Sequence, residues 1–230
     1  MINIAAWNIR GLNSPLKLKE VFHFIQSNSI QFFGILETKL SASSLDILKT
    51  KFDSKGSWSI QSNILSTSRA RIIIGWSSAT IQACQIISSS PQFMHCLLIA
   101  GGQRFYVTMI YAFNQIQYRA PLWSELTSIS QSMFDPWVLL GDFNCLLSTQ
   151  DRIGSPVAMR ETTELNDFFS NCGISDIPHT GFKFTWSNKR YSSSIIHCKL
   201  DRVCCNGQWI AAFPDSHAIF SPPGISDHCP

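Results

Sequence analysis

Polar side chains that could handle phosphate chemistry stand where strand-like apolar runs stop. The runs and the residues that follow them are 2–7 with Asn8, 30–36 with Glu37, 105–110 with Tyr111, and 137–140 with Asp142 and Asn144. Polar groups are costly in the middle of a buried strand, but groups at strand ends can meet at one rim of a sheet. Carboxylates, amides and a phenol at such a rim form an oxygen-rich site that suits Mg²⁺.

Each of these residues also has an ordinary structural explanation. Glu37 and Asn8 could each be the first solvated residue of a loop, and Tyr111 a half-buried strand residue. The Gly-Asp-Phe-Asn segment at 141–144 could be a turn, because Asp and Asn favour turns. The recurrence of such residues at the ends of four separate runs favours the functional interpretation.

Two further groups lie late in the sequence. Asp201 follows another β-rich run, 195–200, and Asp227 directly precedes His228. An adjacent Asp-His pair is common on protein surfaces, so it gains significance only if Asp201 reaches His228. A carboxylate bonded to one ring nitrogen fixes the tautomer of the other nitrogen and stabilises the imidazolium.

Few helices and many strands must position these groups. Apolar residues at helical spacing predict helices over 18–25, 45–52, 122–133 and 165–172, the first preceded by Ser14 and Pro15 and the last closed by Gly173. Residues 57–110 are strand-rich, and Gly101-Gly102 predicts a hairpin turn between 94–100 and 103–111. One domain of two packed sheets with outer helices fits this pattern.

Composition narrows the class of protein. The 230 residues are 45% hydrophobic and 14% charged, with a net charge of +3, which permits nucleic-acid binding without arguing for it. None of the eight cysteines forms a Cys-x-x-Cys pair, and no apolar run is long enough to cross a bilayer. A strand that begins at Ile2 leaves no room for a signal peptide. We expect an intracellular protein with reduced cysteines, disulfides being the alternative.

Seven short motifs in order resemble the endonuclease/exonuclease/phosphatase superfamily. They are Trp-Asn-Ile-Arg-Gly-Leu-Asn at 7–13, Leu-Glu-Thr-Lys at 36–39, Ile-Tyr-Ala-Phe-Asn at 110–114, Gly-Asp-Phe-Asn at 141–144, Phe-Thr-Trp at 184–186, Leu-Asp-Arg at 200–202 and Ser-Asp-His at 226–228. Their residues most resemble those of the endonuclease domain of plant LINE-type non-LTR retrotransposons. That domain is similar to abasic-site endonucleases and DNase I. The resemblance implies an α+β fold, a four-layer α/β/β/α sandwich of two mostly antiparallel sheets.

The resemblance also implies a metal site. Glu37 would be the main ligand, with Asn8 beside it and Asp227 completing the site. The ion would be Mg²⁺, with Mn²⁺ as the alternative. Arg10 stands where abasic-site endonucleases usually have an acid, so a single metal ion is expected.

Catalytic roles follow from the same resemblance. Asp142 would orient or deprotonate the attacking water, and Asn144 would hold the scissile phosphate or the nucleophile. Tyr111 would donate to a phosphate oxygen. His228, oriented by Asp201, would stabilise the charge that develops on the phosphate. Such preorganised donors typically contribute ~10²–10³ in rate each.

The function these features favour is a Mg²⁺-dependent DNA endonuclease that nicks one strand and leaves a 3′-hydroxyl. Asn114, Trp186 and Arg10 would contact DNA, although Trp186 could equally be a packed core residue. One alternative is a phosphatase of the same superfamily that acts on inositol phosphates or lipid head groups. Another is a catalytically silent remnant that only binds nucleic acid.

The domain would span 1–230, and family members continue beyond the Asp-His pair with a strand that this sequence lacks. We therefore expect His228 to be loosely held, because unanchored termini tend to be disordered. The parent element would carry a reverse transcriptase domain. We expect a nuclear monomer that does not bind membranes.

Overall fold

The computed structural model describes residues 2–54, 56–190 and 194–230 and is built on two large sheets. The first sheet has the order β1 (Ile4–Asn8), β2 (Phe32–Leu40), β4 (Ala70–Ser77) and β3 (Trp58–Ser62). The second has the order β10 (Ser175–Asp176), β14 (Asp201–Cys205), β8 (Trp137–Asp142), β7 (Gln103–Tyr111), β6 (Phe93–Ala100) and β5 (Ile81–Ser89).

Shorter strands lie beside these sheets. A three-stranded sheet has the order β12 (Trp186–Ser187), β13 (His197–Cys198) and β9 (Arg152–Ile153), and β11 (His179–Gly181) pairs in parallel with β15 (Ala218–Phe220). The helices are α1 (Pro15–Ser27), α2 (Ala42–Asp53), α3 (Ile116–Gln131), α4 (Arg160–Cys172) and α5 (Gly207–Ala212), with 3₁₀ turns η1 (Ile64–Ser66) and η2 (Thr149–Asp151). In the described part of the chain, no helix combines the length and apolar character needed to cross a membrane.

The four predicted helices are confirmed. The start of the first helix and the end of the fourth lie where the sequence indicated. The hydroxyl of Ser14 accepts a hydrogen bond from the backbone N–H of Lys17 at the start of α1, and Pro15 is the first helical residue. Gly173 closes α4 in the left-handed conformation, with φ of 62°. Met133 lies beyond the end of α3, and α5 was not predicted.

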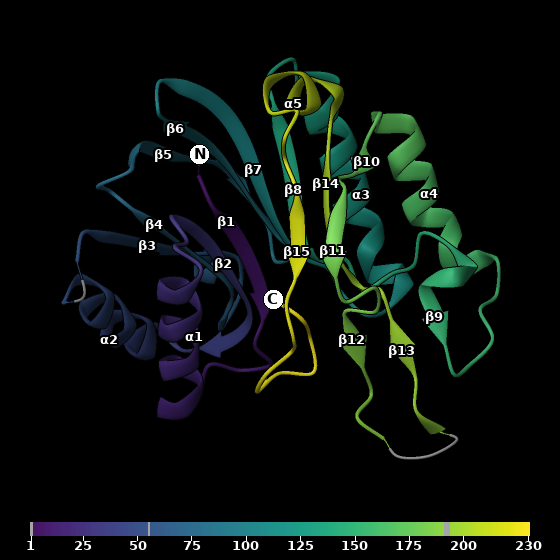
Figure 1. The fold of residues 1–230 in the computed structure, drawn as a ribbon, viewed down its shortest axis with the longest axis horizontal. Helices are drawn as coiled ribbons and strands as arrows, with labels where there is room; N and C mark the ends of the chain where they lie inside the picture. The colour runs from purple at the N-terminus through teal and green to yellow at the C-terminus, as the bar shows by residue number, and fades with distance from the viewer. Residues whose placement is uncertain (1, 55, 191–193) are drawn as a thin grey trace.

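Three buried clusters separate four layers (Figure 1). The strand β2 shows how they arise, because its side chains alternate between two faces. Phe33 packs with Val21 and Phe52 of the helices α1 and α2, whereas Phe32 packs with Met109 of the second sheet. The third cluster lies between the second sheet and α3 and α4. The predicted α/β/β/α sandwich is therefore confirmed.

Both sheets are mostly antiparallel, and each contains one parallel pair. β1 is parallel to β2, with Asn8 opposite Leu36, and β7 is parallel to β8, with Tyr111 opposite Asp142. Parallel neighbours end on the same side of a sheet. Asn8, Tyr111 and Asp142, the last residues of β1, β7 and β8, therefore lie at the ends of these parallel pairs.

Two predicted strand ends are wrong. β2 does not stop before Glu37 but continues to Leu40, with its register to β4 interrupted between Leu36 and Leu40. Asp201 begins β14 instead of following a strand over 195–200, where only β13 forms. The backbone N–H groups of Leu200 and Asp201 donate to the hydroxyl of Thr185, which replaces a strand ladder at this point.

The expectation that His228 is loosely held is also wrong. His228 is only 4% exposed, and its carbonyl accepts a hydrogen bond of 3.1 Å from the indole N–H of Trp7. The backbone N–H of Cys229 donates to the carbonyl of Thr185 at 2.7 Å. Contacts on both sides therefore fix this segment between β1 and β12.

A buried histidine lies in the second sheet, away from the polar rim. His95 is 2% exposed and its Nδ1 lies 2.8 Å from the hydroxyl of Thr108. That hydroxyl accepts from the indole N–H of Trp137 at 2.7 Å, and its own hydrogen can be donated to Nδ1 of a neutral His95. Protonation of His95 would replace this acceptor with a second donor. Burial lowers the pKa of His95 from 6.5 to about 4.

We expect acid to destabilise the fold through His95. Between pH 6.5 and 4 the unfolded state binds a proton that the folded state does not, so the free energy of unfolding falls as the pH falls through this window. The loss at pH 4 is about 3 kcal/mol, from roughly 2.5 pH units at 1.36 kcal/mol each. Urea unfolding of the native protein and of His95→Asn, which keeps an acceptor near the Nδ1 position, measures this loss. An equal acid loss in both proteins would contradict the assignment.

Candidate active site

The carboxylate of Asp142 lies at the centre of the polar rim. It is 1% exposed and accepts from the side-chain Nδ2 of Asn8 at 2.8 Å. The backbone N–H of Asn144 donates to its Oδ1 at 3.0 Å, and the Asn144 Nδ2 lies 3.2 Å from its Oδ2. Asn144 Nδ2 also donates to the carbonyl of Ala112 at 2.9 Å. Residues predicted from the ends of β1 and β8 are therefore in direct contact.

Gly141 permits this alignment. It has φ of 132°, and a Cβ atom there would lie 2.2 Å from the carbonyl oxygen of Ile110. Only glycine lets β8 approach β7 so closely. Asp142 is thereby placed opposite Tyr111.

His228 lies between two carboxylates. Its Nδ1 is 2.9 Å from Asp201 Oδ2, and its Nε2 is 3.8 Å from Asp142 Oδ2. Burial opposes the charged ring, but Asp201 and Asp142 outweigh it and raise the pKa of His228 to about 9. Burial raises the pKa of Asp142 to about 7, while His228 works against that rise. His228 therefore carries a proton at neutral pH, with Nδ1–H donated to Asp201.

Two hydroxyl groups that were not assigned roles from the sequence hold this pair. Thr185 accepts the backbone N–H of Asp201 at 2.9 Å. Ser226 donates to the carbonyl of Asn8 at 2.6 Å and accepts the backbone N–H of His228 at 3.2 Å. Both residues lie inside recognised motifs, and that position was the only available signal.

Glu37 lies on the first sheet beside a cation and a phenol. Its Oε1 is 2.7 Å from the Lys39 ammonium. Burial works against the ionised form, but hydrogen bonding to Lys39 and to Tyr111 holds the pKa of Glu37 below its usual range. Burial and the nearby Glu37 raise the pKa of Tyr111, so the phenol stays protonated and can donate.

Asp227 has one satisfied oxygen and one unsatisfied oxygen. Its Oδ2 accepts from the Arg10 guanidinium and from the indole N–H of Trp186, the latter at 2.9 Å. Its Oδ1 is buried without a hydrogen-bond partner among the described residues. Trp186 is half-buried, and its ring centroid lies 6.5 Å from that of His228. Trp186 therefore borders the site instead of lying in the core.

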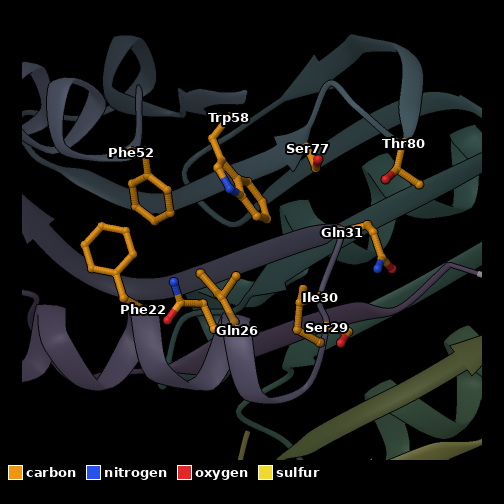
Figure 2. A pocket seen from close by; sticks show the side chains of 10 residues that line it. Phe22, Gln26, Ser29, Ile30, Gln31, Phe52, Trp58, Ser77 and Thr80 are labelled. Atoms are coloured by element: carbon orange, nitrogen blue, oxygen red, sulfur yellow. The ribbon is translucent and has the colours of Figure 1, made fainter. Parts of the chain in front are cut away.

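Asn114 is exposed, and its carbonyl accepts from Arg119 at 2.7 Å. Among the described residues, its side chain makes no hydrogen bond to the residues at the rim. A cavity of about 220 Å³ lies elsewhere, bordered by α1, α2 and β3, with Phe22, Phe52 and Trp58 among its lining residues (Figure 2). It shares no residue with the candidate active site.

Two sets of side chains could hold a cation. Ligand atoms of Asp142, Asp201 and His228 lie within 4.8 Å of one another. A cation bound to this set would have to displace the proton of His228, because a protonated ring has no free lone pair. The other set contains the carboxylates of Glu37 and Asp227, with the unsatisfied Asp227 Oδ1, and the amide oxygen of Asn8. An oxygen-only set suits a hard divalent cation.

The fold is similar to that of several proteins of known structure. No family model matches the chain, and a search of curated proteins finds no match. Solved structures do match. The AP endonuclease LMAP from Leishmania major has a TM-score of 0.73 and 14% identity, over 97% of this chain and 84% of that chain.

Two further solved structures also have a similar fold. The endonuclease domain of TRAS1, a telomere-specific non-LTR retrotransposon, has a TM-score of 0.70 and 10% identity, over 99% of this chain and 94% of that chain. An AP endonuclease from Archaeoglobus fulgidus has a TM-score of 0.67 and 16% identity, over 90% and 87%. The chain has the fold shared by these proteins. Its membership of the endonuclease/exonuclease/phosphatase superfamily stays a prediction from its motifs. The link to plant elements stays a prediction.

Replacing Asp201 with asparagine removes the charge that favours the His228 imidazolium. We expect the pKa of His228 in Asp201→Asn to fall from about 9 by one unit or more. NMR titration of the His228 ring measures this pKa directly, and the half-buried Asp135→Asn variant, outside the candidate site, serves as the control. An unchanged pKa in Asp201→Asn would show that Asp201 does not stabilise the protonated ring.

Proposed function

We propose that the chain is a Mg²⁺-dependent phosphodiester hydrolase, a DNA endonuclease of retrotransposon type that nicks one strand to leave a 3′-hydroxyl. One observation carries this proposal. A buried carboxylate, Asp142, is oriented by Asn8 and Asn144 and faces a protonated histidine, His228. That arrangement pairs a water-orienting group with a cationic donor, as hydrolysis of a phosphodiester requires.

Glu37, Asn8 and Asp227 are the residues we assign to the metal ion. The support is the buried Asp227 oxygen that has no partner among the described residues, together with the oxygen-only donor set. A bound Mg²⁺ would neutralise charge on a non-bridging phosphate oxygen. Lys39 and Arg10 neutralise Glu37 and Asp227 in the structure described here.

The chain's own residues supply the other parts of the mechanism. Asp142 would orient the attacking water, since a raised pKa keeps it a usable proton acceptor near neutral pH. Asn144 uses its amide hydrogens to hold Asp142 and Ala112, which leaves its oxygen to accept from that water. Tyr111 and His228 would donate to the phosphate oxygens, with Asp201 keeping His228 protonated.

DNA is the substrate that the comparisons support best. The similar structures include AP endonucleases and the TRAS1 endonuclease domain. Arg10 and Asn114 are exposed, and Trp186 borders the site, so all three remain candidates for DNA contact. A reverse transcriptase domain in the parent element and a nuclear location belong to the same proposal.

The first test is nicking of supercoiled plasmid. We expect nicks with Mg²⁺, none with EDTA, and a rate at least ~10²-fold lower in Asp142→Asn, because the variant loses the charge that orients water. Asp135→Asn, at a half-buried position outside the candidate site, should retain the native rate. Folding of each variant is checked by circular dichroism.

The other outcomes of that test separate the competing functions. Phosphate release from inositol phosphates or phosphoinositides without nicking would replace the nuclease with a phosphatase. A gel shift with DNA and no hydrolysis of any of these substrates would leave a binding protein.

Metal binding has its own prediction. Titration with Mn²⁺, followed by electron paramagnetic resonance, should show binding that is about tenfold or more weaker in Glu37→Gln than in the native protein. The exposed Glu125→Gln on α3 is the matched control. If Asp201→Asn weakened binding while Glu37→Gln did not, the ion would belong to the set of Asp142, Asp201 and His228.

A further inference from the structure

Arg71 connects the two sheets beside the candidate active site. It lies on β4 of the first sheet, where its backbone N–H donates to the side-chain oxygen of Asn63 at 3.0 Å. Its Nε donates to the carbonyl of Pro91 at 2.8 Å, in the turn between β5 and β6 of the second sheet. Hydrogen bonds therefore hold the backbone of Arg71 to Asn63 and its side chain to the turn of the second sheet.

The guanidinium of Arg71 lies over two aromatic rings. Its Cζ is 4.2 Å from the ring centroid of Tyr111 and 4.4 Å from that of Phe113. Its Nη2 also lies 3.4 Å from the carbonyl oxygen of Tyr111. A cation on an aromatic face is attracted to it, more strongly where water is excluded, so Arg71 restrains the Tyr111 ring.

The same turn that holds Arg71 also holds the backbone of Tyr111. The N–H of Tyr111 donates to the carbonyl of Gln92, and the N–H of Phe113 donates to the side-chain oxygen of Gln92, each at 2.8 Å. Contacts thus hold both the backbone and the ring of Tyr111. Its hydroxyl is hydrogen-bonded to Glu37.

The charge of Arg71 acts within the site as well. Burial disfavours the guanidinium and lowers its pKa, while Tyr111, Glu37 and Asp142 favour it. These are three of the groups to which the proposed function gives roles in phosphate contact, metal binding and water orientation. No motif in the sequence indicated that Arg71 belongs beside them.

We propose that Arg71 is a positioning residue for catalysis, which acts through Tyr111 by holding the phenol where its hydroxyl meets the phosphate. The inference rests on the proposed function, because Tyr111 is assigned there as the phosphate donor. A positioning role predicts loss of kcat with little change in KM. It also predicts that the effect disappears when the hydroxyl of Tyr111 is absent.

A double-mutant cycle in the plasmid-nicking assay tests this. Arg71→Met keeps an apolar stem on the rings and should lower kcat about tenfold or more, with KM changed less than ~3-fold. In the Tyr111→Phe background, the same substitution should lower kcat less than ~2-fold, since the residues act as one unit. Arg71→Lys should restore part of the rate. The matched control is Arg104→Met, which removes a cation from the Tyr106 ring on the same strand.

Equal losses in the two backgrounds would overturn the proposal, and so would a rise in KM with kcat unchanged. If the native protein does not nick DNA, the proposed function is contradicted instead.

A second measurement then tests whether Arg71 positions the Tyr111 ring. In protein with ¹³C-labelled tyrosine, Arg71→Met should alter the ring resonances or ring-flip rate of Tyr111, and Arg104→Met should leave them unchanged. A Tyr111 ring unaffected by Arg71→Met would overturn the inference whatever the substrate.

Discussion

The structure depends on burying the carboxylate of Asp142 without leaving it unpaired. A buried charge is destabilising by several kcal/mol unless hydrogen bonds and an opposite charge offset its desolvation. Here the donors come from Asn8 at the end of β1 and from Asn144 after β8, and the opposite charge comes from His228. Asn144 is local to Asp142, but Asn8 and His228 are remote in the sequence, so the two sheets and the segment that carries His228 must be correctly packed before these two can serve Asp142. Packing of the sandwich is therefore a condition for the interaction that orders the candidate site.

The same site concentrates backbone strain. Arg10, Glu37 and Asn144 all have φ near 50°, in the left-handed region that non-glycine residues seldom occupy. Such conformations cost of order 1–3 kcal/mol each and persist only where the surroundings impose them. At Glu37 the imposing contact is visible, because its carbonyl accepts the backbone N–H of Gly11 at 2.7 Å. The backbone departs from regular strand conformation where a polar side chain has to be directed into the site.

The sequence predicted the fold well because apolar periodicity and strand ends are local signals. Asn8, Tyr111 and Asp142 were found from such ends, and the order of motifs predicted the sandwich. Asp201 was found by its motif but placed on the wrong side of a strand, since its ladder is interrupted by a hydroxyl from Thr185, remote in sequence. Arg71 was missed for a similar reason. A lone arginine in a β-rich run gives no indication of which rings it will meet across the core.

Charge balance explains why an added cation would matter to this site. Glu37 is paired with Lys39 and Asp227 with Arg10, while Asp201 and Asp142 share the protonated His228, so the chain itself offsets most of the negative charge of these four carboxylates. A site in such balance exerts only a weak field on an approaching phosphodiester anion, and the net charge of +3 over the whole chain adds little to it. At this site the buried Asp227 Oδ1 has no hydrogen-bond partner among the described residues. A divalent cation bound there would satisfy that oxygen and leave the site positive, so binding of the metal and attraction of the anion would depend on the same atom.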